Sequence, residues 1–510
     1  MGVSDLVQFQ DTTLRDGVQS LWAMKLRYGA QEAVLDQLDQ GGMLNVEPNP
    51  IHSVYFKNAV FNLKEDPWEM CRLWKRKIKN MRGIGGAIGL ALNSAEMAQP
   101  REFTRLWIQT TKKALPYDMS FQIVNTRDET KLDFPWLVPM LRDEGIELYP
   151  AVTYGVSPRH TDEYYSNFTK ELVEKWNPDG IVLKDVMGLL TPDRARTWIP
   201  AIMQHVGDRP VVMHSHGMSG NHEKNFVEAM KAGVRILTTC VPPLAYGSAH
   251  PSIFNTIHNA HALGLKTDIN EEPLRIVEQR LTAYAKQEGL PIGAPEPYDL
   301  NVYKYQIPGG VISNTVAQLE QLGIGDKLHE VLEDTAQIIV DLGHPLMITP
   351  HSQFIVSQAA INVATGERYG DLLDYMIEFA LGIWGDEESG VPYMDQNLKD
   401  KLLSHPNAKV LAERWEQRKE LAETTTLKEM RADYGMTDAS DEDFLLAYVM
   451  GGTEQIKAMR EAGPPKRCYT GQEPLMVLLN ELKKHKDISR LQLRKGDSFF
   501  DFRQKQGADS

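Results

Sequence analysis

The stretch DGIVLKDVMGLLTP (residues 179–192) contains an apolar run of the kind that forms a buried strand, and Lys184 and Asp185 end that run. A buried ammonium group costs free energy unless it is paired, and apolar surroundings lower its pKa. Taken alone, the stretch favours an ion pair between Lys184 and Asp185 at the end of a strand. The rest of the chain decides whether a functional interpretation is better.

Similar apolar runs recur up to about residue 290, separated by longer segments with helical spacing, such as TDEYYSNFTKELVEKWN (161–177) and NHEKNFVEAMKAG (221–233). The expected strands are LVQFQDTT (6–13), MSFQIVN (119–125), IELYPAVTYG (146–155), GIVLKDV (180–186), RPVVMHSH (209–216) and VRILTTCV (234–241). Alternation of strands and helices implies parallel pairing through helical crossovers. At this length, the pattern predicts a closed (β/α)₈ TIM barrel rather than an open doubly wound sheet.

Beyond about residue 295 the pattern becomes mainly helical. Segments 316–343 and 370–384 have regular apolar spacing, and the highly charged stretch that begins at residue 397 is typical of solvated helices. The chain of 510 residues also exceeds what a single core usually supports. We therefore expect a barrel over residues 1–295, a helical C-terminal domain over 296–485 that completes a funnel, and a short hairpin and tail over 486–510.

Composition excludes several classes of function. The net charge of −14 argues against a nucleic-acid partner, which requires a basic surface. Charged residues interrupt every apolar run before it reaches the length of a membrane span, and the N-terminal residues do not form a signal peptide. The three cysteines, Cys71, Cys240 and Cys468, are too widely spaced for a disulfide framework. These features predict a cytoplasmic protein.

Polar residues follow several of the predicted strands, at the end where a barrel holds its chemistry. His214 and His216 are two residues apart, so on a strand both imidazoles share one face and can reach one ion. A purely structural role for this pair stays open. Asp11 follows another strand and can add an oxygen ligand. A neutral Lys184 amine could capture carbon dioxide as a carbamate, whose anionic oxygens would make Lys184 the fourth ligand.

The loop after the first strand adds Arg15, Asp16 and Gln19. Arg15 could hold or polarise a carbonyl or carboxylate oxygen, and Gln19 could donate a second hydrogen bond. The alternative for Arg15 is an ion pair with Asp16 that closes the loop.

Six stretches in order resemble one family. They are DTTLRDGVQSLWAMKLR (11–27), VTYGVSPRHT (152–161), IVLKDVMGLLTP (181–192), HSHGMSG (214–220), YQIPGGVISN (305–314) and ITPHSQFIVSQAAINVATGERY (348–369). The combination is similar to the carboxyltransferase component of the biotin-dependent pyruvate carboxylase, oxaloacetate decarboxylase and transcarboxylase group. The wider superfamily includes the 3-hydroxy-3-methylglutaryl-CoA lyases and isopropylmalate synthases.

The resemblance implies a metal-centred barrel followed by a helical funnel domain, usually in a homodimer. It implies a divalent metal, either zinc, manganese or cobalt, whose ligands are Asp11, Lys184 as its carbamate, His214 and His216. Arg15 and Gln19 match contacts to the substrate carbonyl. Ser248, in LAYGSAHPS (244–252), aligns with a threonine that relays a proton between biotin and the acceptor, so it stands as a catalytic and a cofactor-binding residue.

The chain also departs from the family pattern. In GGAIGLALN (85–93), Gly89 stands near the place of the arginine that grips a pyruvate carboxylate. In IVNTRDE (123–129), Asn125 replaces an aspartate, and Arg127 could supply a replacement cation. These changes predict an acceptor other than plain pyruvate.

Two short stretches resemble other sites. GIGGAIG (83–89) lacks the spacing of a dinucleotide-binding loop. WAMKL (22–26) resembles a biotinylation site, but Lys25 lies in the first loop–helix segment of the barrel rather than at an exposed hairpin tip. Biotin is therefore expected on a separate polypeptide, with biotin carrier and biotin carboxylase subunits as partners.

Three functions follow from these patterns. The leading hypothesis is a carboxyltransferase subunit that moves carbon dioxide between carboxybiotin and a carbonyl-containing acceptor through a metal-stabilised enolate. The second is a biotin-independent, metal-dependent carbon–carbon lyase or decarboxylase on the same barrel. The third is a non-catalytic assembly subunit that uses the barrel as a scaffold.

Overall fold

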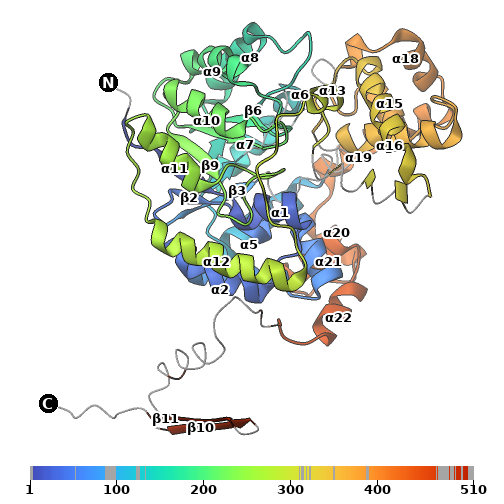
Figure 1. The fold of residues 1–510 in the computed structure, drawn as a ribbon. Coiled ribbons are helices and arrows are strands. Elements are labelled where there is room, and N and C mark those ends of the chain that lie inside the picture. The colour runs from blue at the N-terminus through green and yellow to red at the C-terminus, as the bar shows by residue number, and fades with distance from the viewer. Residues whose placement is uncertain are drawn as a thin grey trace.

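A computed structural model of the chain shows a barrel of parallel strands with helices around it and a helical region beside it (Figure 1). The structure describes residues 4–503 except 52, 87–98, 122–126, 133, 309–310, 312–314, 317–318, 321–322, 349–350, 386–389, 467, 469–481, 483–487, 489 and 496–497.

Nine strand segments form one sheet in the order β5-β4-β3-β2-β1-β9-β8-β7-β6. They are β1 (Gln8–Asp11), β2 (Asn45–Val46), β3 (Arg82–Gly86), β4 (Met119–Phe121), β5 (Glu147–Tyr149), β6 (Ala151–Thr153), β7 (Ile181–Asp185), β8 (Val211–Ser215) and β9 (Ile236–Thr239). Only Pro150 separates β5, which pairs with β4, from β6, which pairs with β7. Proline has no N–H for the strand ladder, so it divides one strand into two segments. The sheet therefore closes into a ring of eight parallel strand positions, as the sequence predicts.

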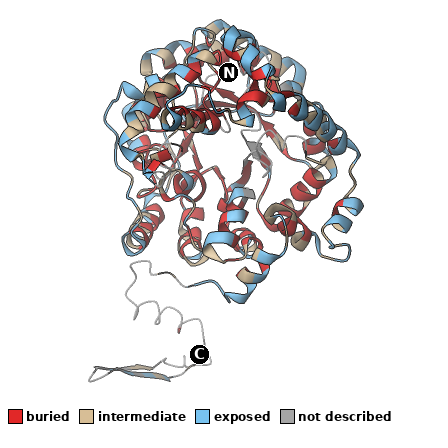
Figure 2. Ribbon diagram, turned by 90° about the vertical axis from the view of Figure 1, so that its right-hand side faces the viewer, coloured by how far each residue is buried: buried red, intermediate tan, exposed pale blue. Residues whose placement is uncertain are grey.

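The crossover helices are α2 (Tyr28–Asp39), α4 (Pro67–Lys77), α5 (Arg101–Ala114), α7 (Phe134–Asp143), α8 (Asp162–Trp176), α9 (Pro192–Val206) and α10 (His222–Lys231). α11 (Ile253–Ala262) follows the last barrel strand, and α12 (Glu271–Glu288) packs on α2. Threonine caps fix two of the starts. The Thr161 side chain accepts from the Tyr164 amide at α8, and the Thr191 side chain accepts from the Arg194 amide at α9. The opening stretch 179–192 therefore covers β7, its loop and the first residue of α9. Figure 2 shows the strands buried inside this ring of helices.

The two strand segments that the sequence patterns do not predict are short or rich in glycine. β2 has only two residues, and β3 has the sequence RGIGG. A Cβ on Gly83 would lie 1.8 Å from the Pro116 carbonyl oxygen, and one on Gly85 would lie 1.9 Å from the Tyr117 ring. Close packing therefore requires these glycines in β3, although glycine lowers the intrinsic strand preference.

The strand register decides which side chains enter the barrel. One apolar cluster consists of alternate residues from neighbouring strands, namely Ile84, Met119, Tyr149, Ala151, Val182, Val212 and Ile236. Side chains two residues apart share a face of a strand. Lys184 follows Val182 in β7 and His214 follows Val212 in β8, and these two residues are register partners. Both therefore belong to the inner face, toward the carboxyl ends of the strands.

The segment after α12 crosses the loops at the carboxyl ends of the strands. The Trp22 indole N–H donates to the Pro291 carbonyl at 2.8 Å, and the Gly247 N–H donates to the Ala294 carbonyl at 2.9 Å. The side-chain N–H of Asn221 donates to the Tyr303 hydroxyl at 3.0 Å. Figure 1 shows this segment rising from α12 toward α13 (Asn301–Tyr305). The segment after α12 therefore contacts chain segments that follow three different strands.

The C-terminal region contains the helices α15 (Leu328–Asp341), α16 (His351–Thr365), α17 (Asp374–Ala380), α18 (Gln396–Leu403), α19 (Pro406–Thr424), α20 (Leu427–Asp433), α21 (Asp441–Met450) and α22 (Glu454–Glu461). α21 returns to the barrel, where the Trp68 indole N–H donates to the Glu442 carbonyl at 3.0 Å. β10 (Arg490–Lys495) and β11 (Ser498–Arg503) form an antiparallel hairpin. Among the described residues, no helix combines the length and apolar character needed to cross a bilayer.

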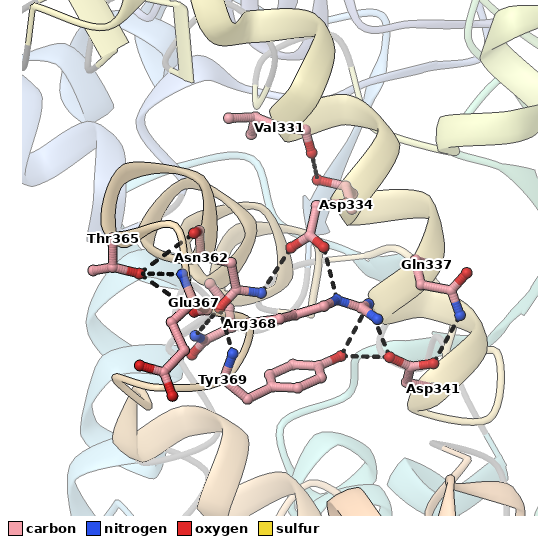
Figure 3. Close-up of polar contacts among 11 residues, drawn as sticks. Val331, Asp334, Gln337, Asp341, Asn362, Thr365, Glu367, Arg368 and Tyr369 are labelled. Carbon is pink, nitrogen blue, oxygen red and sulfur yellow. Dashed lines mark hydrogen bonds and ion pairs between the residues drawn. The ribbon is translucent and has the colours of Figure 1, made fainter.

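A polar network joins α15 to the turn after α16 (Figure 3). Arg368 contacts Asp334 at 2.8 Å and Asp341 at 2.9 Å, and the Tyr369 hydroxyl donates to Asp341 at 2.7 Å. The buried Asn362 side chain donates to Asp334 and accepts from the Tyr369 amide. The ATGERY sequence (364–369) therefore fastens this helix pair together.

Candidate active site

Four buried side chains converge at the carboxyl ends of the strands. His214 lies in β8 and His216 follows it, His250 lies in the loop after β9, and Asp16 lies in η1 (Thr13–Gly17), a π-helical turn after β1. One possible donor atom from each of Asp16, His214, His216 and His250 lies within 4.8 Å of the other three. One carboxylate and three imidazoles are a donor set that suits a divalent transition metal.

Backbone carbonyls orient two of the imidazoles. Nδ1 of His216 lies 2.7 Å from the Ser248 carbonyl oxygen, and Nδ1 of His250 lies 3.0 Å from the Ser215 carbonyl oxygen. A carbonyl can only accept a hydrogen bond, so Nδ1 carries the hydrogen in both rings. In the neutral rings, the lone pair is then on Nε2. Histidine ligands of metals show this same arrangement, in which the second ring nitrogen donates to a carbonyl.

The electrostatics of the cluster favour neutral His214 and His216 beside an ionised Asp16 carboxylate. Burial lowers the pKa of His216 to about 4, and burial together with His250 and His216 lowers the pKa of His214 well below its usual value. Burial opposes ionisation of Asp16, but the Arg15 guanidinium together with His216 and His250 outweighs burial and holds the pKa of Asp16 well below its usual range. These are the protonation states that bind a metal ion.

Lys184 lies beside His214 in the barrel. The Asp185 carboxylate is engaged elsewhere, since it accepts from the Leu189 amide at 2.8 Å, the Leu190 amide at 3.1 Å and the Ser215 hydroxyl at 2.9 Å. Neighbouring residues of a strand point to opposite faces, which separates the Lys184 and Asp185 side chains. The arrangement differs from the ion pair that the isolated stretch favours.

Asp11 lies outside this group of donors. β1 pairs with β9 so that Gln8 is opposite Ile236 and Asp11 is opposite Thr239. Ile236 faces the barrel interior, so Asp11 belongs to the other face of β1, which also carries Phe9. The Asp11 carboxylate accepts from the Thr13 hydroxyl at 2.5 Å. Burial raises the pKa of Asp11 to about 7. Asp16 therefore occupies the place among the histidines that the family resemblance implies for Asp11.

Arg15 is held between two carboxylates. Its Nη1 lies 3.2 Å from Oδ2 of Asp16, and its Nη2 lies 2.6 Å from Oε1 of Glu47. Burial disfavours the cation, but Glu47 and Asp16 raise the pKa of Arg15 above its ordinary value. Nη1 also donates to the exposed Gln19 side chain at 3.3 Å, and the Tyr55 hydroxyl donates to the Arg15 carbonyl. The ion pair between Arg15 and Asp16 is present, and it extends to Glu47.

Ser248 touches the cluster through its backbone. Its carbonyl oxygen accepts from His216, and its hydroxyl donates to the Ser20 carbonyl at 2.9 Å. The side chain is partly exposed. Ser248 therefore lies between the loop after β9 and α1 (Val18–Trp22), beside the candidate ligands.

None of the residues at which the chain departs from the family pattern belongs to the group of four candidate ligands, and two of them lie outside the described residues. Gly89 and Asn125 are not among the residues that the structure describes. Arg127 forms a 2.6 Å ion pair with Glu171 of α8 and lines a surface hollow with residues of that helix. Lys25 is exposed in the turn between α1 and α2, not at the tip of a hairpin.

Sequence patterns did not single out His250 or Glu47. His250 follows Ser248 by two residues in LAYGSAHPS (244–252), so its position after a predicted strand was a usable signal. Glu47 follows β2, which is too short to recognise from its sequence. The role of Glu47 can be recognised only in the folded chain, where Arg15 approaches it from the turn after β1.

Comparison with known proteins gives two family matches. Residues 6–280 match a family described as HMGL-like, and residues 302–478 match one described as a conserved carboxylase domain. The chain is 28% identical to a pyruvate carboxylase subunit of Methanothermobacter thermautotrophicus over 74% of this chain and 66% of that protein. It is 28% identical to the 2-oxoglutarate carboxylase large subunit of Hydrogenobacter thermophilus, over 79% of this chain and 60% of that protein.

A third relative is matched over most of its length. The methylmalonyl-CoA carboxyltransferase 5S subunit of Propionibacterium freudenreichii is 26% identical over 87% of this chain and 85% of that subunit. Among solved structures, the carboxyl transferase domain of Rhizobium etli pyruvate carboxylase, with pyruvate and biocytin, superposes with a TM-score of 0.75. That match has 21% sequence identity and covers 90% of this chain and 78% of the other, and it shows the same fold.

Proposed function

Because the chain belongs to the HMGL-like family and carries a conserved carboxylase domain after its barrel, we propose that it is a carboxyltransferase subunit. It moves a carboxyl group between carboxybiotin and a carbonyl-containing acceptor through an enolate. The observation that carries this proposal is the buried convergence of Asp16, His214 and His216 at the carboxyl ends of the barrel strands. The sequence resemblance and the named relatives agree with it.

The proposed metal ligands are Asp16, His214 and His216, with Lys184 as its carbamate. The orphaned Nε2 of His250 and the carbonyl contacts of Nδ1 in His216 and His250 support a metal at this place. A divalent ion bound there supplies Lewis-acid stabilisation of the negative charge on an enolate. Lys184 is next to His214 in register, so a carboxylated Lys184 amine lies within the same inner face.

The other polar residues hold the acceptor and move a proton. Arg15, fixed by Glu47 and Asp16, and the exposed Gln19 contact the carbonyl oxygen of the acceptor. A hydroxyl that donates one hydrogen bond keeps its acceptor lone pairs. For a relay, the Ser248 hydroxyl turns away from the Ser20 carbonyl, and Oγ takes a proton from the acceptor while it gives its own proton to biotin, which regenerates the hydroxyl.

The acceptor is proposed to be a 2-oxo acid. Two relatives are named for pyruvate and 2-oxoglutarate, and the sequence departures at Gly89 and Asn125 argue for an acid other than plain pyruvate. All three relatives are named as subunits of carboxylases or of a carboxyltransferase. We therefore propose separate biotin carrier and biotin carboxylase subunits as partners, and a homodimer of this chain.

The proposal is tested by asking whether the reaction depends on biotin. The purified chain is incubated with a panel of carboxylated 2-oxo acids, oxaloacetate included, and release of carbon dioxide is measured with and without free biotin. The Asp16→Asn variant is the matched control. In parallel, the chain is pulled down from its native host, and the captured proteins are probed with streptavidin.

We expect biotin to stimulate the release of carbon dioxide by the original chain but not by the Asp16→Asn variant. We also expect the pull-down to capture a biotinylated protein. Turnover without biotin and no captured biotinylated protein would instead establish the lyase or decarboxylase. A protein with no stoichiometric metal, an unmodified Lys184 and no turnover would point to the assembly subunit.

A further inference from the structure

His250 is the least accessible of the histidines in the cluster. Its side chain is 0% exposed, and it lies in the loop between β9 and α11. Backbone hydrogen bonds fix this loop on both sides of His250. The Gly217 N–H donates to the Ala249 carbonyl at 2.9 Å, and the Cys240 N–H donates to the Pro251 carbonyl at 3.0 Å. The imidazole is therefore held in one place before any ligand binds.

Gly217 permits this close approach of the two loops. A Cβ at Gly217 would lie 2.3 Å from the Gly247 carbonyl oxygen and 3.0 Å from Cε1 of His222. A larger residue would therefore push the loop after β8 away from the loop that carries His250. The glycine follows His216 directly, so the same short turn positions both histidines.

The hydrogen-bond pattern leaves one donor atom of His250 unused. Nδ1 faces the Ser215 carbonyl, so Nε2 carries the lone pair in the neutral ring. Among the described residues, Nε2 has no hydrogen-bond partner, and it lies 3.4 Å from Oδ2 of Asp16. The His250 ring centroid lies 4.2 Å from that of His214 and 4.4 Å from that of His216. A buried lone pair that points into a cluster of metal-binding side chains requires a partner.

We propose that His250 is a direct metal ligand in addition to Asp16, His214 and His216, so that this chain binds its metal through three histidines. The inference rests on the proposed function, which requires a metal at this place. A carbamate on Lys184 strengthens binding but is not essential to it, because one carboxylate and three imidazoles already supply four donor atoms.

The competing interpretation is that a protonated His250 only neutralises Asp16. The two interpretations predict opposite results, because a cationic ring close to the site repels a metal ion whereas a neutral ring binds it. Metal affinity therefore distinguishes them.

The experiment measures Co²⁺ binding to the full-length chain, followed by its visible absorption and by metal analysis after dialysis. We expect His250→Gln to weaken Co²⁺ binding by roughly 100-fold or more, because even residues that only orient a ligand cost about 10–100-fold. His222→Gln is the matched control. His222 is buried beside the loop but does not belong to the group of four, so Co²⁺ affinity should remain that of the original chain.

Unchanged or tighter binding of Co²⁺ to His250→Gln would overturn the proposal. If this variant does not fold, the original chain loaded with Co²⁺ provides the test by proton NMR. Three exchangeable, paramagnetically shifted imidazole N–H signals are expected, and only two would contradict a third histidine ligand. Carboxyl transfer is measured separately. If three histidine ligands are present but biotin-dependent carboxyl transfer is not observed, the proposed function alone is rejected. If carboxyl transfer is observed but only two histidine ligands are present, this inference alone is rejected.

Discussion

Nη2 of Arg15 lies 2.6 Å from Oε1 of Glu47, and both side chains are buried beside the candidate metal ligands. Since Nη1 of the same guanidinium contacts Asp16, Arg15 connects Glu47, the residue after β2, to the carboxylate of the site, which lies in the same π-helical turn as Arg15. Glu47 has no expected contact with acceptor or metal. It acts by holding Arg15, and through Arg15 it holds Asp16.

Glu47→Gln should destabilise the fold, because it leaves a buried guanidinium with one carboxylate instead of two. Removing one partner of a buried ion pair costs about 3–5 kcal/mol, and the remaining contact with Asp16 places the expected loss near the lower limit. Urea unfolding measures this loss in the free energy of unfolding. Glu147→Gln removes a carboxylate from an Arg82 pair at 2.8 Å in which both partners are exposed, so its cost should stay below about 1 kcal/mol. Equal losses in the two variants would contradict this role of Glu47.

Asp16→Asn should remove most of the bound metal, whereas Asp11→Asn should leave the metal content close to that of the original chain. The reason is the strand register, which keeps Asp11 on the face of β1 opposite the barrel interior. Metal analysis of both purified variants after dialysis checks the difference. Loss of metal from Asp11→Asn and not from Asp16→Asn would instead identify Asp11 as the ligand.

Lys184→Ala should lower the metal affinity, and a short-chain carboxylic acid should partly restore it by supplying the oxygens of the missing carbamate. Lys184→Arg is the control, since a guanidinium forms no such carbamate and its side chain fills the space that the acid needs. Metal titrations with and without the acid test the prediction. Unchanged metal affinity in Lys184→Ala would argue against the carbamate.

Ser248→Ala should slow carboxyl transfer by about 10²–10⁴-fold, the usual contribution of a positioned proton-transfer group. Metal content should not change, because the Ser248 backbone carbonyl that orients His216 is kept in alanine. Ser248→Thr retains the hydroxyl and should keep most of the activity. A loss of metal in Ser248→Ala, or full activity without the hydroxyl, would contradict the proton-relay role.

Asn362→Ala should reduce the free energy of unfolding by about 2 kcal/mol, because it leaves the Tyr369 amide and Asp334 without their buried partner. The exposed Gln337, whose side chain donates to Asp341 at 2.9 Å in the same network (Figure 3), provides the control. Gln337→Ala should cost less than about 0.5 kcal/mol. Denaturant unfolding followed by circular dichroism measures both variants.

The local sequence pattern was sufficient to predict most strands of the barrel. The apolar runs that include β1, β4, β7, β8 and β9 are recognisable because buried parallel strands have short, nearly continuous apolar sequences. β2 and β3 were not recognisable, since one has two residues and the other depends on glycines that only its neighbours require.

The sequence by itself determined that His214 and His216 share a face and that Lys184 ends a buried strand, because side-chain alternation is a property of the local backbone. It also placed Asp16 in a loop directly after β1. Only the tertiary structure decided which carboxylate meets the histidines and that His250 joins them. Those relationships depend on the pairing of β1 with β9 and on the approach of the loops after β8 and β9, contacts that join residues far apart in the chain.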